Sequence, residues 1–421
     1  MARAGTTAGG SRGSVTCRGR AIITAACVSV LLAACGPAST AGGRPSATGP
    51  GGAATAAESA VTTAAPSPAP AGSPAESFDL MDLSGPGFGL AGLGTGQAGG
   101  YARLVASADS GRSFTAIGPR TAAWTATDDV FFLGRQDGWF AVFNVTTLAE
   151  TLYRTTDGGR TWHGYAAPAH NMAAGSSDIV QFRTPARGWL VSTEANAPAE
   201  SLYSTTDGGI SWHLVASLRT AHGSGILPEL GQVWFEPGGR AGWLGGGLFS
   251  RALYRTGDGG RTWRQASIPA PAGSQFGLPA GSGRTLLEPV TLCSGALVLY
   301  RSTDGGTRWS QVSALPGATT AAPACGPAAV SVSFPSLLAG WATAVRAART
   351  VIYRTTDGGR RWEEISSSWK VPPDTDVPPV IQGIDATHAW LLTPGSARVY
   401  ATVNGGTTWR RIDTAAIAAG S

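Results

Sequence analysis

The residues best suited to chemistry in this sequence are acidic, and they recur at one position of a repeated turn. The turn reads T-T-D-G-G-R-T-W at 155–162 and occurs seven times in close variants, from "SADSGRSF" at 107 to "TVNGGTTW" at 402. Its acidic or amide positions, 46 to 53 residues apart, are Asp109, Asp157, Asp207, Asp258, Asp304, Asp357 and Asn404. Calcium needs several oxygen ligands that converge within one loop. Each turn supplies one carboxylate followed by glycine, so we expect a structural turn and no metal site.

Paired carboxylates would support a second chemistry, the hydrolysis of glycosides. The two groups must face each other across a cleft, roughly 5 to 9.5 Å apart. Outside the turns the candidates are Asp128, Asp129, Asp137, Asp178, Glu194, Glu200, Glu229, Glu236, Glu288 and Asp385. None of them stands in a recognisable motif, and we predict no catalytic residue. No H-E-x-x-H metal motif occurs, and Lys370 is the only lysine, so a phosphate-binding loop with its lysine is also missing.

Local hydrogen bonding and backbone geometry explain why these residue types recur in the turn. The Asp side chain can accept hydrogen bonds from backbone N–H groups just downstream, and Asn404 can do much the same. At least one of the two glycines is expected at positive φ, where a Cβ would clash. An aromatic residue follows three positions after the second glycine, on a returning strand, where a large ring can pack between sheets. These residues are Phe114, Trp162, Trp212, Trp263, Trp309, Trp362 and Trp409.

The elements that carry the turns are short strands. In the sixth repeat the apolar and alternating stretches are "VSVSF" at 330, "GWATAV" at 340, "VIYRTT" at 351 and "RRWEEI" at 360. Four such strands with turns between them predict an antiparallel sheet. Residues 78–413 divide into seven repeats of 48 residues, and a repeat of this length is typical of propellers, whose sheets cover one another's faces. The sequence therefore predicts an all-β, seven-bladed propeller of four-stranded antiparallel blades.

The repeated motif S/T-x-D-x-G-x-x-W resembles the Asp-box, or bacterial neuraminidase repeat. This repeat occurs in propellers of the sialidase superfamily, in some glucan hydrolases, in sortilin-type receptors and in photosystem II assembly and stability factors. Joined to the upstream "GW", as at 188 and 340, it is most similar to the last group. The resemblance implies the propeller fold and places the Asp-box turns away from the functional face.

A sialidase would also need the F/Y-R-I-P motif, whose arginine binds a carboxylate through two hydrogen bonds. The stretch "FRTP" at 182–185 resembles it. In sialidases, however, that motif precedes the first Asp-box, whereas Arg183 follows two of them. We therefore interpret this stretch as the end of a strand.

The N-terminal segment has the pattern of an export signal. Residues 1–34 carry four arginines and no acidic residue, and an apolar run of 15 residues spans 21–35. Such a run is short for a membrane-spanning helix and suits a signal peptide. Its end, "LAAC" at 32–35, resembles the bacterial lipobox, which implies lipidation of Cys35 and an exported lipoprotein on the outer face of the cell membrane. An ordinary secretory signal or an uncleaved anchor is the alternative.

Residues 35–77 are predicted to be a disordered tether, and residues 78–421 the propeller. Between 36 and 77 there is no aromatic residue, and Val61 is the one large aliphatic residue, so this stretch cannot bury enough apolar surface to fold. Two cysteines, Cys293 and Cys325, lie beyond the tether, and an oxidising compartment leaves them either paired or free. Without the four leader arginines, 27 basic residues face 26 acidic ones, which argues against a nucleic-acid partner.

Binding is the function that these observations favour. Long connections are expected at the face opposite the Asp-box turns, and Trp369 beside Lys370 in one of them is a candidate contact. We predict a monomeric, non-catalytic lipoprotein that needs no cofactor and recognises a protein or a glycan at that face. The alternative is a glycoside hydrolase, sialidase-like or glucan-cleaving, on the same fold.

Overall fold

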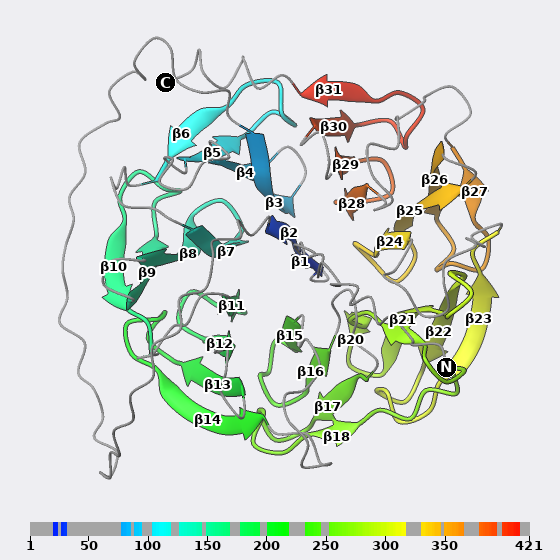
Figure 1. Cartoon of the computed structure of the whole chain (residues 1–421), viewed down its shortest axis with the longest axis horizontal. Helices are drawn as coiled ribbons and strands as arrows, with labels where there is room; N and C mark the ends of the chain where they lie inside the picture. Colours follow the sequence, from blue (N-terminus) through cyan, green and yellow to red (C-terminus); the bar gives the residue numbers. More distant parts are fainter. Residues whose placement is uncertain are drawn as a thin grey trace, which may run out of the picture.

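The chain folds into a ring of β-sheets (Figure 1). The computed structural model describes residues 20–23, 27–31, 77–85, 88–94, 103–118, 126–144, 149–168, 177–193, 200–218, 232–245, 252–316, 330–346, 349–365, 379–393 and 398–412. These ranges contain strands and turns and no α-helix. Cys35, Cys325, Trp369 and Lys370, together with the predicted tether up to residue 76, lie outside the described residues.

Six of the sheets are antiparallel blades of four strands, one of them with an additional short strand, β20. The first two blades consist of β7 (Ala126–Leu133), β8 (Asp137–Asn144), β9 (Ala149–Thr155) and β10 (His163–Ala166), and of β11 (Ser177–Phe182), β12 (Gly188–Thr193), β13 (Glu200–Thr205) and β14 (His213–Leu218). The next two consist of β15 (Gln232–Phe235), β16 (Gly242–Gly245), β17 (Tyr254–Thr256) and β18 (Arg264–Gln265), and of β19 (Gln275–Phe276), β20 (Ala280–Ser282), β21 (Thr285–Thr291), β22 (Leu297–Ser302) and β23 (Ser310–Ala314). The last two consist of β24 (Val330–Ser333), β25 (Gly340–Arg346), β26 (Arg349–Thr355) and β27 (Glu363–Glu364), and of β28 (Val380–Gly383), β29 (Ala389–Thr393), β30 (Arg398–Thr402) and β31 (Arg410–Ile412).

The remaining sheet has six strands in sequence order. They are β1 (Arg20–Ile23), β2 (Cys27–Leu31), β3 (Ser77–Gly85), β4 (Phe88–Gly94), β5 (Arg103–Ser107) and β6 (Thr115–Ile117). Strands β1 and β2 belong to the predicted leader; β2 pairs with β3, and both are drawn near the centre of the ring in Figure 1. The all-β propeller is thus confirmed, with six four-stranded blades where the sequence predicts seven, and with a longer sheet that precedes them.

The core of the ring lies between consecutive blades, because each blade offers an apolar face to the next one. Trp139 of β8 stacks on Phe182 of β11 with ring centroids 3.7 Å apart, and Trp189 of β12 stacks on Phe235 of β15 at 4.1 Å. The second-strand tryptophans are at most 1% exposed, and they are Trp139, Trp189, Trp243, Trp341 and Trp390. Four of these tryptophans belong to the repeated "GW" of the sequence, which therefore supplies a buried ring to several of the contacts between blades.

The first and last sheets meet through the same kind of contact. Phe114, next to β6, packs edge-on against Trp390 of β29, with ring centroids 6.5 Å apart. Val105 and Ile412 belong to the same buried cluster. On its other side the first sheet packs through Leu104 against Phe140 of the β7–β10 blade. Residues some 300 positions apart in the sequence are thereby neighbours in the ring.

Candidate functional site

Each Asp-box is a turn closed by its own carboxylate. Asp157 Oδ1 accepts hydrogen bonds from the Thr155 hydroxyl (2.8 Å) and from the Thr161 N–H (2.9 Å), and its Oδ2 accepts one from the Thr161 hydroxyl (2.7 Å). The Thr155 hydroxyl oxygen in turn accepts the Gly159 N–H at 2.8 Å. Both carboxylate oxygens are therefore held by groups within four residues, and the turn is fixed by local chemistry.

The last copy reaches the same geometry with an amide. Asn404 Oδ1 accepts the Thr402 hydroxyl and the Thr408 N–H, both at 3.0 Å, while its Nδ2 donates to the Thr408 hydroxyl at 2.8 Å. In the aspartate and the asparagine copies alike, Oδ1 accepts the hydroxyl two residues before it and the N–H four residues after it, and neither bond depends on a negative charge. Asn404 is therefore a structural equivalent of the six aspartates.

Hydrogen bonding keeps the Asp-box carboxyls ionised. Partial burial would raise the pKa of Asp109, but hydrogen bonds from Ser113, Ser107 and Arg112 outweigh it and hold this pKa at about 2. For Asp258 the hydrogen bond from the Thr262 side chain is the largest cause, and the pKa again lies below the ordinary range. A carboxylate of such low pKa cannot donate a proton near neutral pH, which is what a general acid must do.

Both glycines of the turn have positive φ. In the second Asp-box the values are 75° for Gly158 and 87° for Gly159. A Cβ on Gly159 would lie 2.7 Å from the Cβ of Ile117 in the preceding sheet, so this glycine also permits the sheets to approach. Two requirements thus favour glycine at the second position: the positive φ and the close packing between sheets.

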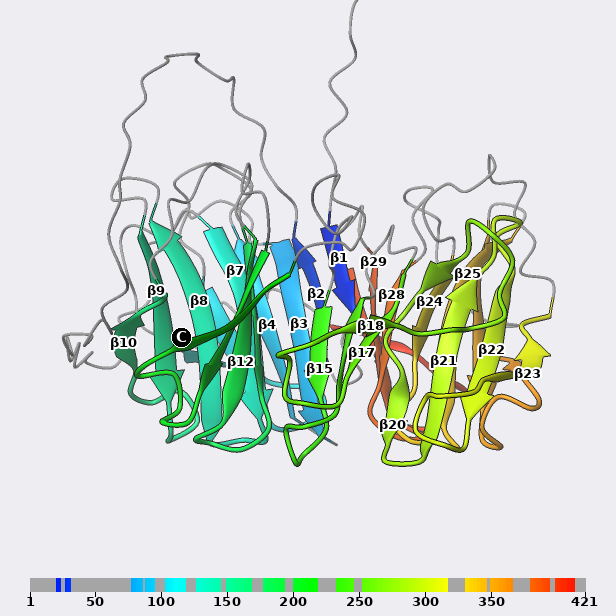
Figure 2. The same cartoon turned by 90° about the horizontal axis from the view of Figure 1, so that it is seen from below.

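The Asp-box turns lie at one end of the blades, beside the turns between first and second strands. The Gly158 N–H donates to Gln136 O at 2.9 Å, and the equivalent bond of the last blade joins the Gly405 N–H to Thr387 O at 2.8 Å. Figure 2 shows these turns along the lower edge of the ring. We call this surface, formed by the Asp-box turns and the turns between first and second strands, the Asp-box face.

Arginines on the third strands of three blades, β9, β17 and β26, donate to the Asp-box of the next blade. Arg154 of β9 donates from Nη1 to Asp207 O (3.1 Å) and from Nη2 to Pro185 O (3.0 Å), and its guanidinium lies 5.8 Å from the centre of the Trp139 ring. Arg354 of β26 donates in the same way to Gly405 O at 2.9 Å. An arginine stands three positions before the Asp in several repeats, but the spacing alone does not reveal that it contacts the next blade.

The Asp-box face is rich in exposed arginine. Ten exposed arginines lie in its turns, and they are Arg112, Arg160, Arg261, Arg308, Arg360 and Arg361 in the Asp-boxes and Arg135, Arg187, Arg240 and Arg284 in the other turns. The acidic side chains of the same turns are all partly buried. Glu236, for example, accepts the Gly283 N–H of the next blade at 3.0 Å. The charged side chains that are exposed in these turns are thus cationic.

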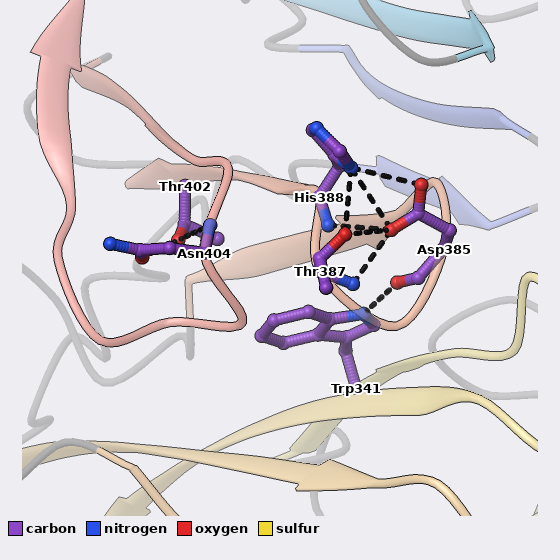
Figure 3. Close-up of polar contacts among 6 residues, drawn as sticks. All are labelled: Trp341, Asp385, Thr387, His388, Thr402 and Asn404. Carbon is purple, nitrogen blue, oxygen red and sulfur yellow. Dashed lines mark hydrogen bonds and ion pairs between the residues drawn. The ribbon is translucent and has the colours of Figure 1, made fainter.

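A shallow pocket of about 390 Å³ lies on this face between the last two blades. Its lining includes Leu338, Ile384 and Asp385. Beside it, Asp385 accepts the N–H of Thr387 (2.6 Å) and of His388 (2.8 Å), and its Oδ2 lies 2.9 Å from His388 Nδ1 (Figure 3). Partial burial would raise the pKa of Asp385, but these hydrogen bonds hold it at about 2.

The Asp385–His388 pair does not form a nucleophilic triad. In such a triad the nucleophile contacts the imidazole nitrogen that the carboxylate leaves free. Here the Thr387 hydroxyl lies 3.0 Å from His388 Nδ1, the same nitrogen that Asp385 contacts. The main-chain carbonyl of Asp385 also accepts the indole N–H of Trp341 at 2.7 Å (Figure 3). The geometry indicates a turn that is closed by a carboxylate and linked to the neighbouring blade.

The other predicted acids and the FRTP arginine also have structural surroundings. Glu288 of β21 is fully buried, and neither of its carboxyl oxygens has a hydrogen-bond partner among the described residues. Arg183 donates from Nε to Phe235 O of the next blade, and its guanidinium lies 4.7 Å from the centre of the Trp234 ring. The side chains of Asp128, Asp129, Asp178 and Glu200, like residues 194 and 229, lie outside the described part.

Three remaining expectations concern metals, membranes and cysteine. The described residues contain no cluster of three His, Cys, Asp or Glu side chains that could hold a metal ion. Within the same ranges there is no helix that is long and apolar enough to cross a membrane. Cys293, after β21, is disulfide-bonded. Because Cys325 lies outside the described residues, its pairing with Cys293 stays a prediction.

Comparison with known proteins identifies a shared fold and no family. No protein-family model matches the chain, and no curated protein matches it in sequence. The GH74 xyloglucanase from Xanthomonas campestris has a similar structure, with a TM-score of 0.53 and 18% identity over 78% of this chain and 52% of that chain. YCF48 bound to a D1 peptide gives 0.46 and 19% (70% and 84% covered), and YCF48 from Cyanidioschyzon merolae gives 0.44 and 17% (69% and 85% covered). This chain spans about half the length of the xyloglucanase, and at such identity the likeness shows the propeller fold alone.

Proposed function

We propose that this protein is a non-catalytic, lipid-anchored propeller that binds a protein or a glycan at the end of the ring opposite the Asp-box face. The observation that carries this proposal is the engagement of the repeated acids. Asp109, Asp157, Asp207 and Asp258 accept hydrogen bonds at both carboxylate oxygens, and Asp304 and Asp357 accept them at Oδ1. The pKa values of all six are lowered, so the most abundant candidates for catalysis serve as turn closures. A rigid ring whose repeated polar groups are internally satisfied is suited to present loops to a partner.

The strand ends support the choice of the opposite end. The chain leaves β14 at Leu218 and enters β15 at Gln232, so a connection of 13 residues begins and ends away from the Asp-box turns. The connection between β27 and β28 contains Trp369 and Lys370, which we propose as contacts. Long connections on a stable scaffold are frequent carriers of recognition.

We also infer that the first sheet supplies a seventh blade. Phe114 contacts Trp390 of the last blade, and Arg410 Nη2 donates to Ser110 O at 2.9 Å, so this sheet lies between the last blade and the β7–β10 blade. Its strands β3 to β6 follow the order of the other blades. Cleavage before Cys35 would remove β1 and β2 and leave β3 as the inner strand of this blade.

Membrane anchoring and binding can be tested separately. Cys35→Ala should move the protein from the membrane fraction to the soluble fraction, whereas Cys17→Ala, within the predicted leader, should leave it in the membrane. Continued anchoring of Cys35→Ala would contradict the lipoprotein proposal. For binding, chemical crosslinking and affinity capture from membranes should retain a partner with the parent protein and lose it with Trp369→Ala/Lys370→Ala. A matched pair of substitutions on the Asp-box face, Arg135→Ala/Arg284→Ala, should leave this capture unchanged.

The alternative function is that of a glycoside hydrolase, and an activity assay on the same purified protein tests it. The purified protein should not release reducing sugar from xyloglucan, from other glucans or from sialosides. Turnover that is abolished by one acid-to-amide substitution would replace the binding proposal with an enzymatic one.

A further inference from the structure

Two kinds of exposed side chain coincide on the Asp-box face. One kind is the set of ten arginines that are exposed in its turns. The carboxylates nearest to them in sequence are already occupied: Asp258, for instance, accepts the Thr262 N–H at 2.9 Å and the Thr262 hydroxyl at 2.6 Å. Those carboxylates are held by their own turns, while the arginine side chains are exposed; Nη1 of Arg160, Arg261 and Arg360 also donates at 3.3 Å to the main-chain carbonyl of the aspartate in the same turn. An approaching surface therefore meets positive charge first.

The second kind is aliphatic. Four large hydrophobic side chains are exposed among the residues that the structure describes, and three of them are in turns of the Asp-box face. These are Ile210, which is 38% exposed, Leu338 at 58% and Val403 at 47%. The fourth, Leu214, is 59% exposed and lies two residues after the third Asp-box tryptophan, near the same end of its blade. Leu338 and Val403 lie on the neighbouring β24–β27 and β28–β31 blades, whereas Ile210 lies on the β11–β14 blade, so each is a single exposed aliphatic side chain among the arginines of the face.

We propose that the Asp-box face docks onto a lipid bilayer with anionic headgroups. Basic side chains near such a surface are attracted by its negative potential, and aliphatic side chains among them can enter the boundary between headgroups and acyl chains. A nucleic acid would satisfy the arginines and leave Ile210, Leu338 and Val403 in water, so the aliphatic residues favour lipid. The turns that carry both kinds of residue are stiff, because each is closed by its own hydrogen bonds. The face therefore needs no refolding to meet a flat surface.

This inference does not depend on the lipid anchor or on the partner proposed above. It gives the propeller an orientation, however, because a ring that lies on its Asp-box face turns its opposite end away from the membrane. The strand ends that bound the proposed binding loops are at that opposite end.

Vesicle binding tests the inference directly. The full chain carrying Cys35→Ala, which cannot be lipidated at that residue, is sedimented with vesicles of phosphatidylcholine containing about 30% phosphatidylglycerol, and with vesicles of phosphatidylcholine alone. We expect binding to the anionic vesicles that weakens as salt is raised, since salt screens exposed charges. The apolar leader segment is common to all variants, so the differences between variants report on the face.

Charge reversal on this face is compared with the same reversal at the other end. Arg261→Glu/Arg360→Glu should lower the affinity for anionic vesicles by about 25-fold or more, from roughly fivefold for each arginine lost. Arg349→Glu/Arg398→Glu changes the charge equally at the starts of β26 and β30, away from the Asp-box turns, and should bind like the parent. Thermal denaturation of each variant shows whether the fold is retained. Leu338→Ser/Val403→Ser should weaken binding to anionic vesicles without altering its salt dependence.

Several results would overturn the inference. Equal loss with the two reversed pairs would mean that only total charge matters. Binding to neutral vesicles as strong as to anionic ones, or unaffected by Arg261→Glu/Arg360→Glu, would remove the role of the face. A duplex DNA probe that binds in place of anionic vesicles, with the same dependence on Arg261 and Arg360, would identify a nucleic-acid surface and refute the lipid assignment.

Discussion

Glu288 provides the sharpest test of the packing between blades. It lies on β21 between Leu286 and Val290, which belong to one buried apolar cluster, and opposite Tyr300 of β22 in the same cluster. Its side chain is 0% exposed. Burial raises the pKa of Glu288 well above its ordinary value; the Gly277 N–H opposes this shift only in part, and its hydrogen bond goes to Pro289 O at 3.1 Å. At a pH between its ordinary and its raised pKa, this residue should therefore be a neutral carboxylic acid in an apolar contact.

Replacement of Glu288 by Met should stabilise the protein, and more so as the pH rises. Because the folded-state pKa is raised, the folded protein keeps a proton that the unfolded chain has released. The free energy of unfolding of the parent thus falls by about 1.4 kcal/mol for each pH unit between the ordinary and the raised pKa. Below the ordinary pKa this contribution vanishes. There the variant should gain only from removing a buried polar group without a partner, about 1 to 3 kcal/mol.

Urea unfolding of the parent and of Glu288→Met from pH 4 to pH 8 measures this difference. Leu286→Met is the control, since it changes the same face of the same strand without removing a titrating group, and its effect should not depend on pH. The difference between Glu288→Met and the parent should be flat in acid and then increase with the expected slope. Parallel curves over the whole range would refute the reasoning, because Glu288 would then titrate alike in the folded and unfolded states.

Other predictions concern the turns and the contacts between blades. Asp207→Ala removes an acceptor of the Ile210 and Ser211 N–H groups and should lower the free energy of unfolding in urea by about 1 to 3 kcal/mol. Asp207→Asn should lower it much less, because Asn404 closes the same turn with an amide. Equal losses would mean that charge, and not hydrogen bonding, holds the turn. Gly159→Ala should lower the melting temperature more than Gly134→Ala does. Both residues have positive φ, but an added Cβ would meet another atom within 4 Å only at Gly159. The reverse order would refute the packing argument. Arg154→Met should cost about 1 to 2 kcal/mol through its two lost carbonyl contacts, and no loss on urea unfolding would show that water replaces them fully. Acid should destabilise the fold below about pH 4, because the lowered pKa values of the Asp-box aspartates give stability that is lost as pH falls towards those values; a pH titration followed by circular dichroism checks this.

The turns were predictable in detail because their bonds are local. Every partner of Asp157 lies within four residues of it, so the letters T-x-D-G-G-x-T contain the donors, the acceptors and the backbone freedom that the turn requires. The spacing of about 48 residues was sufficient to predict a propeller, because a repeat of four short strands cannot cover its own faces. The export signal and the tether are likewise predictions from composition, and they await the fractionation experiment.

The polarity of the faces could not be found from composition. Beyond the leader, basic and acidic residues are nearly equal in number, which argued against a nucleic-acid partner and did not indicate a basic face. The structure separates the two kinds, because the Asp-box aspartates turn inward to close their loops while neighbouring arginines such as Arg261 and Arg360 extend into solvent. A net charge does not say on which face the charged side chains lie, and that placement decides which surface a partner meets.

By itself the sequence determined the repeat, the chemistry of the Asp-box turn and the positions of the aromatic residues, since each depends on residues close together in the chain. Only the tertiary structure decided that Arg154 reaches the Asp-box of the next blade, 53 residues away, that Glu288 is enclosed by apolar side chains, and that arginines and aliphatic residues share one face. These features arise from contacts between blades, whose geometry depends on how the whole ring is assembled. The residues were visible in the sequence, but their partners became known only when the ring was assembled.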